Sequence, residues 1–265
     1  MNHKGRKQSK KSTKCNRVRM FISAFLGLTM CISLIAMDSA IAHAAVAIIN
    51  VPRREITTIL DSTRSFALSN VQDIYVNSSI NSVHVTVHDG SEIIVSFDAP
   101  DDDNHIRIAY ELNDGILTII DYRRGAASTR TRLQAGTLNI AIPQTQSFAV
   151  DSLDINVANA RITIDGQGSA LAENITLNAG NGRIQLADFR VSTITARSGN
   201  GAITAEYLNV DYDATVSTAN GNVTMENSVI LGHLSIRLAR GNITLNNVDT
   251  GTNTLRTIVG RIRNN

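Results

Sequence analysis

The stretch Ser198-Gly199-Asn200-Gly201-Ala202-Ile203-Thr204-Ala205, SGNGAITA, recurs through the C-terminal half of the chain and decides its fold. Clear copies are NAGNGRIQL (178–186), STANGNVTM (217–225) and LARGNITL (238–245), and weaker ones are VANARITI (157–164) and IVGRI (258–262). The equivalent corner positions are Ala160, Gly182, Gly201, Gly221, Gly241 and Gly260, at steps of 22, 19, 20, 20 and 19 residues. A period near 20 is too short for a propeller blade and suits one coil of a β-solenoid.

Aliphatic residues stand at fixed offsets from each corner. Around Gly201 they are Ile203 and Ala205 after the corner and Ile194 and Ala196 before it, with polar residues between them. This alternation is typical of strands with one buried face. Each aliphatic side chain contributes about 1.5–3 kcal/mol on burial, whereas each ordered backbone costs about 1–2 kcal/mol, so one coil alone is unstable. We therefore predict an all-β, single-stranded β-solenoid of stacked coils of about 20 residues.

A less regular β region precedes the regular coils. Ile74 and Val76 before Asn81, and Val83 and Val85 after it, repeat the offsets of the later coils and predict a further coil.

Turn and loop signals divide the rest of this region. HDG (88–90) and NDG (113–115) predict hairpin turns, because Asp-Gly pairs tolerate positive φ. The polar segment 125–136 predicts a loop, and REITTILDSTRSFAL (54–68) is compatible with a short helix.

The first 44 residues have the composition of an export leader. Eight Lys or Arg and one acid precede Ala45, the run Met20–Met37 is uncharged, and small residues with two A-x-A patterns follow it. This order indicates a signal peptide, although an uncleaved membrane anchor fits the same residues. Both alternatives predict an extracytoplasmic body: secreted, periplasmic, at the cell surface, or membrane-anchored. We divide the chain into this segment (1–44), a linker (45–70) and a β-solenoid domain (71–265).

The composition of the body excludes several functions. Both cysteines, Cys15 and Cys31, lie in the leader, so the body has no disulfide and no thiol nucleophile. After Ala44 all 17 basic residues are arginines and 22 residues are acidic, which argues against nucleic acid as a partner.

The glycine corners raise the question of a ligand loop. A phosphate loop opens a helix, and a calcium-binding β-roll needs a carboxylate that is missing here, so we expect no cofactor or metal at the corners. We expect instead structural corners, in which Gly permits αL backbone and the Asn amides stack between coils. The residues are Asn181, Gly182, Asn200, Gly201, Asn220, Gly221, Gly241 and Gly260.

Two other sets of polar residues are candidate sites. His84 and His88, with Asp101–His105, could contribute to a divalent-metal site, but exposed histidines and a solvated acidic loop are the simpler interpretation. The C-terminal carboxylates form no column by their offsets, so we expect no catalytic residues and no enzyme. They are Asp165, Asp188, Glu206, Asp211, Asp213, Glu226 and Asp249.

The succession SVHVTV, DG, GILTI, LNIAIP, GNGxI and ARGNITL resembles the bacterial putative adhesin domain with β-strand repeats, a domain of unknown function. The resemblance covers about residues 71–265. It implies a cell-envelope or secreted β-solenoid, some relatives being encoded beside envelope-stress systems, and it implies no catalytic residues.

From export, the repeat and the resemblance we predict a non-enzymatic surface interaction module with an unknown surface or envelope ligand. The alternatives are a self-assembling scaffold, because the last coil carries little to cover it, and a regulatory component of an envelope-stress system. The membrane contacts the protein only through its N-terminal segment, if that segment stays uncleaved.

Overall fold

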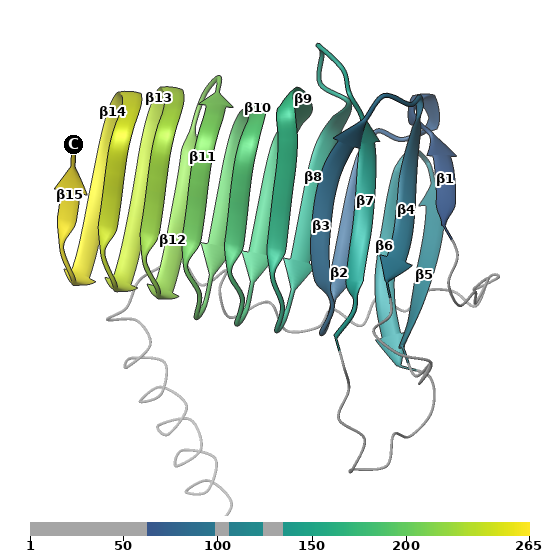
Figure 1. Cartoon of the computed structure of the whole chain (residues 1–265), viewed down its shortest axis with the longest axis horizontal. Coiled ribbons are helices and arrows are strands. Elements are labelled where there is room, and N and C mark those ends of the chain that lie inside the picture. Colours follow the sequence, from purple (N-terminus) through teal and green to yellow (C-terminus); the bar gives the residue numbers. More distant parts are fainter. Residues whose placement is uncertain (1–62, 99–105, 124–134) are drawn as a thin grey trace, which may run out of the picture. The chain divides into compact units, whose positions relative to one another are not determined.

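The computed structural model describes residues 63–98, 106–123 and 135–265, all within one compact unit, Val46–Asn265. The leader 1–44 lies outside these residues, as does the segment 99–105. Figure 1 shows the described strands as a row of coils that ends at β15. Within the described part of the chain, no helix is long and apolar enough to cross a membrane.

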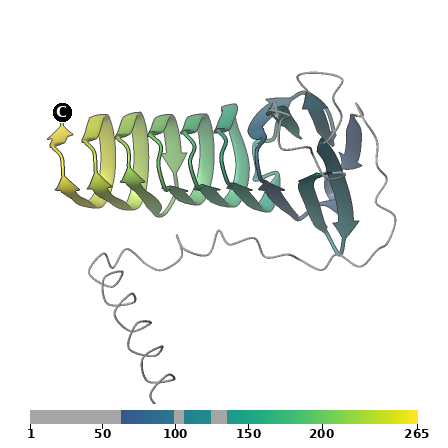
Figure 2. The same ribbon diagram turned by 90° about the horizontal axis from the view of Figure 1, so that it is seen from below.

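Strands β8–β15 form the regular coils, which Figure 2 shows stacked side by side. Their bounds are β8 (Val150–Val157), β9 (Ile162–Ala179), β10 (Ile184–Ser198), β11 (Ile203–Val210), β12 (Ala214–Asn220), β13 (Val223–Arg240), β14 (Ile243–Val259) and β15 (Ile262–Asn264). All are parallel, and the register joins equivalent residues of successive coils, as in Ile184↔Ile203 and Ile203↔Val223. The solenoid prediction is therefore confirmed, with coils of about 20 residues.

The aliphatic columns read from the sequence form the core. Ile194, Ala196, Ile203 and Ala205 are all at most 3% exposed. Each such residue packs against its counterparts in the coils on either side, so one hydrophobic cluster runs through the stack. The register that pairs the strands therefore also closes the apolar layers, which is why the coils are stable only together.

The N-terminal β region consists of β1 (Arg64–Ala67), β2 (Asp73–Ser78), β3 (Ser82–His88), β4 (Glu92–Asp98), β5 (Ile106–Asn113), β6 (Ile116–Arg123) and β7 (Thr137–Pro143), with a 3-10 helix at Leu68–Asn70. β2 pairs in parallel with β8, and β3 with β9, so this segment forms the predicted extra coil. Asn81 lies at its corner and is fully buried.

One of the two predicted hairpins is wrong. β5 and β6 are antiparallel around Asp114 and Gly115, which both have positive φ (48° and 82°), as expected for NDG. β3 and β4, in contrast, do not pair with each other. β7 lies between them, parallel to β3 and antiparallel to β4, so the HDG turn ending at Gly90 joins two strands separated by a third.

Part of the expected linker belongs to the sheet. β1 pairs antiparallel with β4, as in Phe66↔Ile93, and so residues 64–67 are strand rather than the end of a helix. The rest of the suggested helix, 54–62, lies outside the described residues, as does most of the predicted loop 125–136. Gly136 is described, and its N–H donates to the Asn81 side chain at 2.8 Å.

The corner glycines occur where predicted, but the reason given for most of them is wrong. Gly182, Gly201 and Gly221 do not have positive φ; among the corner glycines only Gly241 and Gly260 do. A Cβ built on Gly201 would lie 2.0 Å from the carbonyl oxygen of Gly182 in the preceding coil. Glycine is therefore required because the stacked backbones approach too closely for a side chain.

The asparagines beside these glycines form the expected ladder. Asn181 donates to Asn159, Asn200 to Asn181, and Asn220 to Asn200, with N···O distances of 2.7–2.8 Å. Asn181 and Asn200 thus each accept from one coil and donate to another, which adds side-chain hydrogen bonds along the stack.

A second turn, six positions after most corners, was not predicted. Asp188, Tyr207, Asn227 and Asn247 share φ values of 47–54° there, and Gln167 (47°) is their counterpart in the longer coil of β9. Asp and Asn tolerate αL backbone better than other side-chain-bearing residues do, which explains three of the five. Tyr207 is the residue least suited to this conformation.

Replacing Tyr207 with Asn should stabilise the protein by about 0.5–1 kcal/mol, because it relieves αL strain. The new amide would also extend the ladder in which Asn247 donates to Asn227 at 2.9 Å. Thermal unfolding measures the gain. Tyr212→Asn is the control, since Tyr212 is similarly exposed (64% against 58%) but has no positive φ. An equal shift in both variants would contradict the explanation.

Candidate functional site

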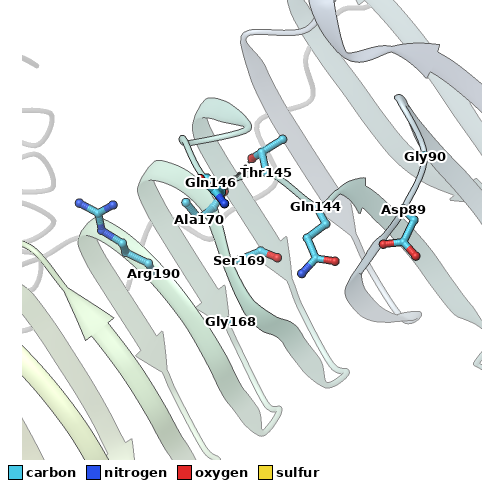
Figure 3. A pocket seen from close by; sticks show the side chains of 9 residues that line it. All are labelled: Asp89, Gly90, Gln144, Thr145, Gln146, Gly168, Ser169, Ala170 and Arg190. Carbon is cyan, nitrogen blue, oxygen red and sulfur yellow. Dashed lines mark hydrogen bonds between the residues drawn. The ribbon is translucent and has the colours of Figure 1, made fainter.

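A polar pocket of about 570 Å³ opens where the N-terminal β region meets the first regular coils. Figure 3 shows its lining, which comes from three segments: the turn after β3, the segment after β7, and the bend of β9 with the adjoining part of β10. The lining residues are Asp89, Gly90, Gln144, Thr145, Gln146, Gly168, Ser169, Ala170 and Arg190. Amide and hydroxyl groups dominate this set.

Extra residues in β9 build one wall of this pocket. The register runs Asp165↔Ala187 and then Ser169↔Phe189, and a second shift follows between Arg190 and Val191. β9 therefore holds more residues than β10 over the same span, which is the physical meaning of the long step of 22 residues in the sequence. The surplus bulges outward through Gln167 and Gly168, which both have positive φ.

Ser169 has an unusual environment in this wall. Its residue is 3% exposed, and its Oγ has no hydrogen-bond partner among the described residues. A buried hydroxyl without a partner costs about 1–3 kcal/mol, so such groups are rare in native proteins. In Figure 3 the Gln144 side chain extends toward Ser169 from the opposite wall.

Backbone hydrogen bonds fix the segment that follows β7. The Gln144 N–H donates to the His88 carbonyl at 2.9 Å, and the Ala170 N–H donates to the Thr145 carbonyl at 3.4 Å. Thr145 Oγ1 donates to the Ser147 carbonyl. The polar side chains of this wall are thus presented by a backbone that is held at both the β3 and the β9 side.

The guanidinium of Arg190, at the edge of the pocket, is already paired with a carboxylate. Arg190 donates through Nε and Nη2 to Asp211 at 3.1 and 2.8 Å, and its guanidinium lies 5.4 Å from the ring centre of Phe148. The carboxylate of Asp211 raises the pKa of Arg190 above its usual range. Figure 3 shows the guanidinium pointing away from Ser169 and Gln144. Asp89 makes no ion pair with any described residue.

The described candidate residues from the sequence do not line the pocket. The corner ladder contributes nothing to the pocket lining. His88 is engaged locally, with Nε2 2.8 Å from the Glu92 carbonyl and Nδ1 accepting from the Gly90 N–H. Asp101–His105, its suggested partners, lie outside the described residues. The described residues include no group of three potential metal ligands.

The expectation that the carboxylates form no column is wrong for three of them. Glu206 and Glu226 are direct neighbours in the parallel register of β11 and β13, and Asp165 occupies the same column in β9, opposite Ala187. Glu226 accepts a hydrogen bond from Asn246 at 2.9 Å. None of the three lines the pocket.

A second polar cluster lies on the outer face of β2 and β8. Burial raises the pKa of Asp154, an effect opposed by the hydrogen bond from Asn156. The neighbouring Tyr75 also has a raised pKa, because of burial and, to a smaller extent, the charge of Asp154. The raised pKa of Asp154 means that its charged form is destabilised by partial desolvation in the folded protein.

The Asp154 shift predicts a pH dependence. Because the folded-state pKa is raised, the folded protein binds a proton more tightly, and stability falls as pH rises from the usual aspartate range through the raised pKa. Asp154→Asn should therefore stabilise the protein at neutral pH, by less than about 1 kcal/mol given solvent screening, and not at pH below the unfolded-state pKa. Urea unfolding at both pH values tests this; equal effects at both would contradict it.

The register and repeated coils define a β-solenoid protein with a lateral polar pocket. Residues 71–263 match the family model described as Toastrack DUF4097, and the chain belongs to this family. The predicted membership of a β-strand-repeat family of unknown function is thereby confirmed. None of the curated proteins matches the chain.

Several solved structures are similar at low identity. A "putative cell adhesion protein" from Clostridium sporogenes has 10% identity and a TM-score of 0.35, covering 78% of this chain and 99% of that chain. A "putative adhesin" from Bacteroides fragilis has 13% identity and a TM-score of 0.27, covering 78% and 97%. A "putative lipid binding protein" from Parabacteroides distasonis has 14% identity and a TM-score of 0.34, covering 77% and 96%.

Proposed function

We propose that the protein is an exported, non-enzymatic interaction module of the cell envelope, acting in the manner of an adhesin. The observation that carries the proposal is a regular polar face along the stack. In register across its strands stand Tyr75, Asp154, Thr176, Thr195, Thr215, Ser235 and Thr254, flanked by Asn77, Asn156, Asn178, Arg197, Arg237 and Arg256; Ser217, in the flanking row, is buried. A regular array of hydroxyl, amide and guanidinium groups suits recognition of an extended partner.

The charges of the body favour a partner other than nucleic acid. After Ala44, acidic residues outnumber basic ones, so no net positive field draws a phosphate backbone. The paired carboxylates Glu206 and Glu226 do not argue for catalysis, because they lie outside the pocket and Asn246 holds one of them.

Localisation and adherence test this proposal together. Cells producing the full chain should expose it to externally added protease, and deleting its gene should reduce adherence to a surface that the wild-type cells colonise. Recovery of the protein in the cytoplasmic fraction alone, or unchanged adherence after deletion, would refute it. Mass determination of the N-terminus decides between secretion and anchoring through Met20–Met37.

A self-assembling scaffold is the second candidate, favoured by the last described coil. Ile262 continues the core column of Ile243 but is 45% exposed, and Ile258 and Val259 on β14 are about 60% exposed. Stacking a second copy on β14 and β15 would cover these exposed side chains. Sedimentation at several concentrations tests this; a concentration-independent monomer would exclude it.

A further inference from the structure

We propose that the polar pocket between β3, β7 and β9 binds a neutral saccharide, of the size of one or two sugar rings. This inference rests on the proposed surface-interaction role and names the ligand class of one site within it. The volume of the pocket, about 570 Å³, lies within the range of about 300–1,000 Å³ typical of small-molecule sites.

The lining matches the chemistry of a sugar. Gln144 and Gln146 each offer a carbonyl acceptor and an amide donor, and Ser169 and Thr145 contribute hydroxyls to the walls. A hydroxyl both donates and accepts, so a ring bearing several hydroxyls can satisfy amides and hydroxyls at once. An apolar ligand would leave these groups unsatisfied, at a cost in affinity.

The charge of the pocket disfavours anions. The arginine in the described lining, Arg190, is bound to Asp211 through two hydrogen bonds and is directed away from the pocket interior. Asp89, which has no ion-pair partner among the described residues, adds a negative charge to the rim. Among the described lining residues no cation is free to balance a phosphate or a carboxylate, so an anionic ligand is disfavoured.

Ser169 supplies the independent sign that this wall serves binding. Its hydroxyl lacks a hydrogen-bond partner among the described residues, although alanine would fit the same space and avoid the cost. Its wall is made by the surplus residues of β9, which leave Phe189 paired with Ser169 and buried at 1% exposure. A hydroxyl that destabilises the free protein is explained if a ligand hydroxyl, with a small adjustment of the wall, completes its bonding.

Titration calorimetry and saturation-transfer NMR on the full chain in mild detergent test the proposal. The probes are lactose, cellobiose, mannobiose and N,N′-diacetylchitobiose, with sialyllactose as the anionic comparator. We expect at least one neutral disaccharide to bind. Gln144→Ala and Ser169→Ala should each weaken its binding about 5- to 10-fold, as expected for the loss of one hydrogen bond.

Two matched variants control for general damage. Gln185→Ala removes the same amide from β10 and Ser192→Ala the same hydroxyl, and neither residue lines the pocket. Both should bind as the wild type does. Ser169→Ala should also unfold at the same or a higher temperature than the wild type, which a merely structural serine would not do.

The outcomes separate this inference from the proposed function. Absence of binding for every neutral probe, equal loss in the control variants, or tighter binding of sialyllactose would overturn the saccharide pocket while leaving surface adherence intact. Pocket-dependent sugar binding by a protein found only in the cytoplasm would overturn the proposed function and leave the pocket standing.

Discussion

Replacing Gly201 with Ala is expected to destabilise the protein by about 3 kcal/mol, a large effect for the addition of one methyl group. A Cβ at this position would lie 2.0 Å from the Gly182 carbonyl oxygen and 2.5 Å from its carbonyl carbon. Both atoms belong to the backbone, so no side chain can move aside. Relief requires separating two coils, which breaks the parallel ladder between β10 and β11.

Chemical denaturation with hydrogen exchange measures this effect. We expect a lower unfolding midpoint and loss of amide protection concentrated in β10 and β11, because solenoid coils depend mainly on their neighbours. Asn200→Ala, at the exposed neighbouring position, is the control and should cost less than about 1 kcal/mol, since it removes only a rung of the surface ladder. If Gly201→Ala unfolded like the wild type, the close approach of coils could not be the reason for glycine.

The corners show how a correct position can be predicted for a wrong reason. The period near 20 residues placed Gly201 correctly, because residues at equivalent positions of the repeat lie in register in successive coils. The φ of Gly201 could not be predicted from the sequence, because glycine suits both a positive φ and a close backbone contact. The backbone φ of Gly201 and its close approach to Gly182 decide between the two.

Local patterns succeeded where the contacts are local or repeated. The alternation around Asn81 identified the first coil, and NDG identified the turn between β5 and β6, since both signals lie within a few residues. HDG failed because β3 pairs with β7 and β9, both distant in sequence, and not with β4. A turn motif indicates a reversal of the chain but does not determine which strands pair.

The sequence contains one sign of the pocket, a longer coil, but the alternation of apolar residues does not predict the pocket from it. The step of 22 residues to Gly182 showed that one coil is longer, but not where its surplus leaves the strand. The register shifts place the surplus around Gln167–Leu171, against the turn at Asp89 and the segment after β7. Three segments distant in sequence form this site, so its geometry depends on the N-terminal pairing that the repeat did not specify.

Replacing Asp121 with Ala is expected to cost about 3 kcal/mol or more, through the corner of the first coil. Its carboxylate accepts hydrogen bonds from Ser78 Oγ at 2.6 Å, Asn81 Nδ2 at 2.7 Å and the Ser79 N–H at 2.8 Å. Ser78 and Asn81 are at most 1% exposed, so they would lose a charged acceptor that water cannot readily replace. Hydrogen bonds to charged groups contribute about 1.5–3 kcal/mol each, with incomplete additivity.

Chemical denaturation with hydrogen exchange, as for Gly201→Ala, can separate the effect of charge from that of hydrogen bonding at this corner. Asp121→Asn keeps one carbonyl acceptor and should lose about half as much stability as Asp121→Ala, whereas Glu111→Ala, an exposed carboxylate on β5, should change it little. Amide protection should fall first in β2 and β3, which this carboxylate joins through Asn81. Uniform loss across all coils, or a cost below about 1 kcal/mol for Asp121→Ala, would show that the N-terminal coil is held by its aliphatic core alone. The expected result implies that a partly buried carboxylate, rather than an asparagine ladder, fixes the corner where the repeat begins.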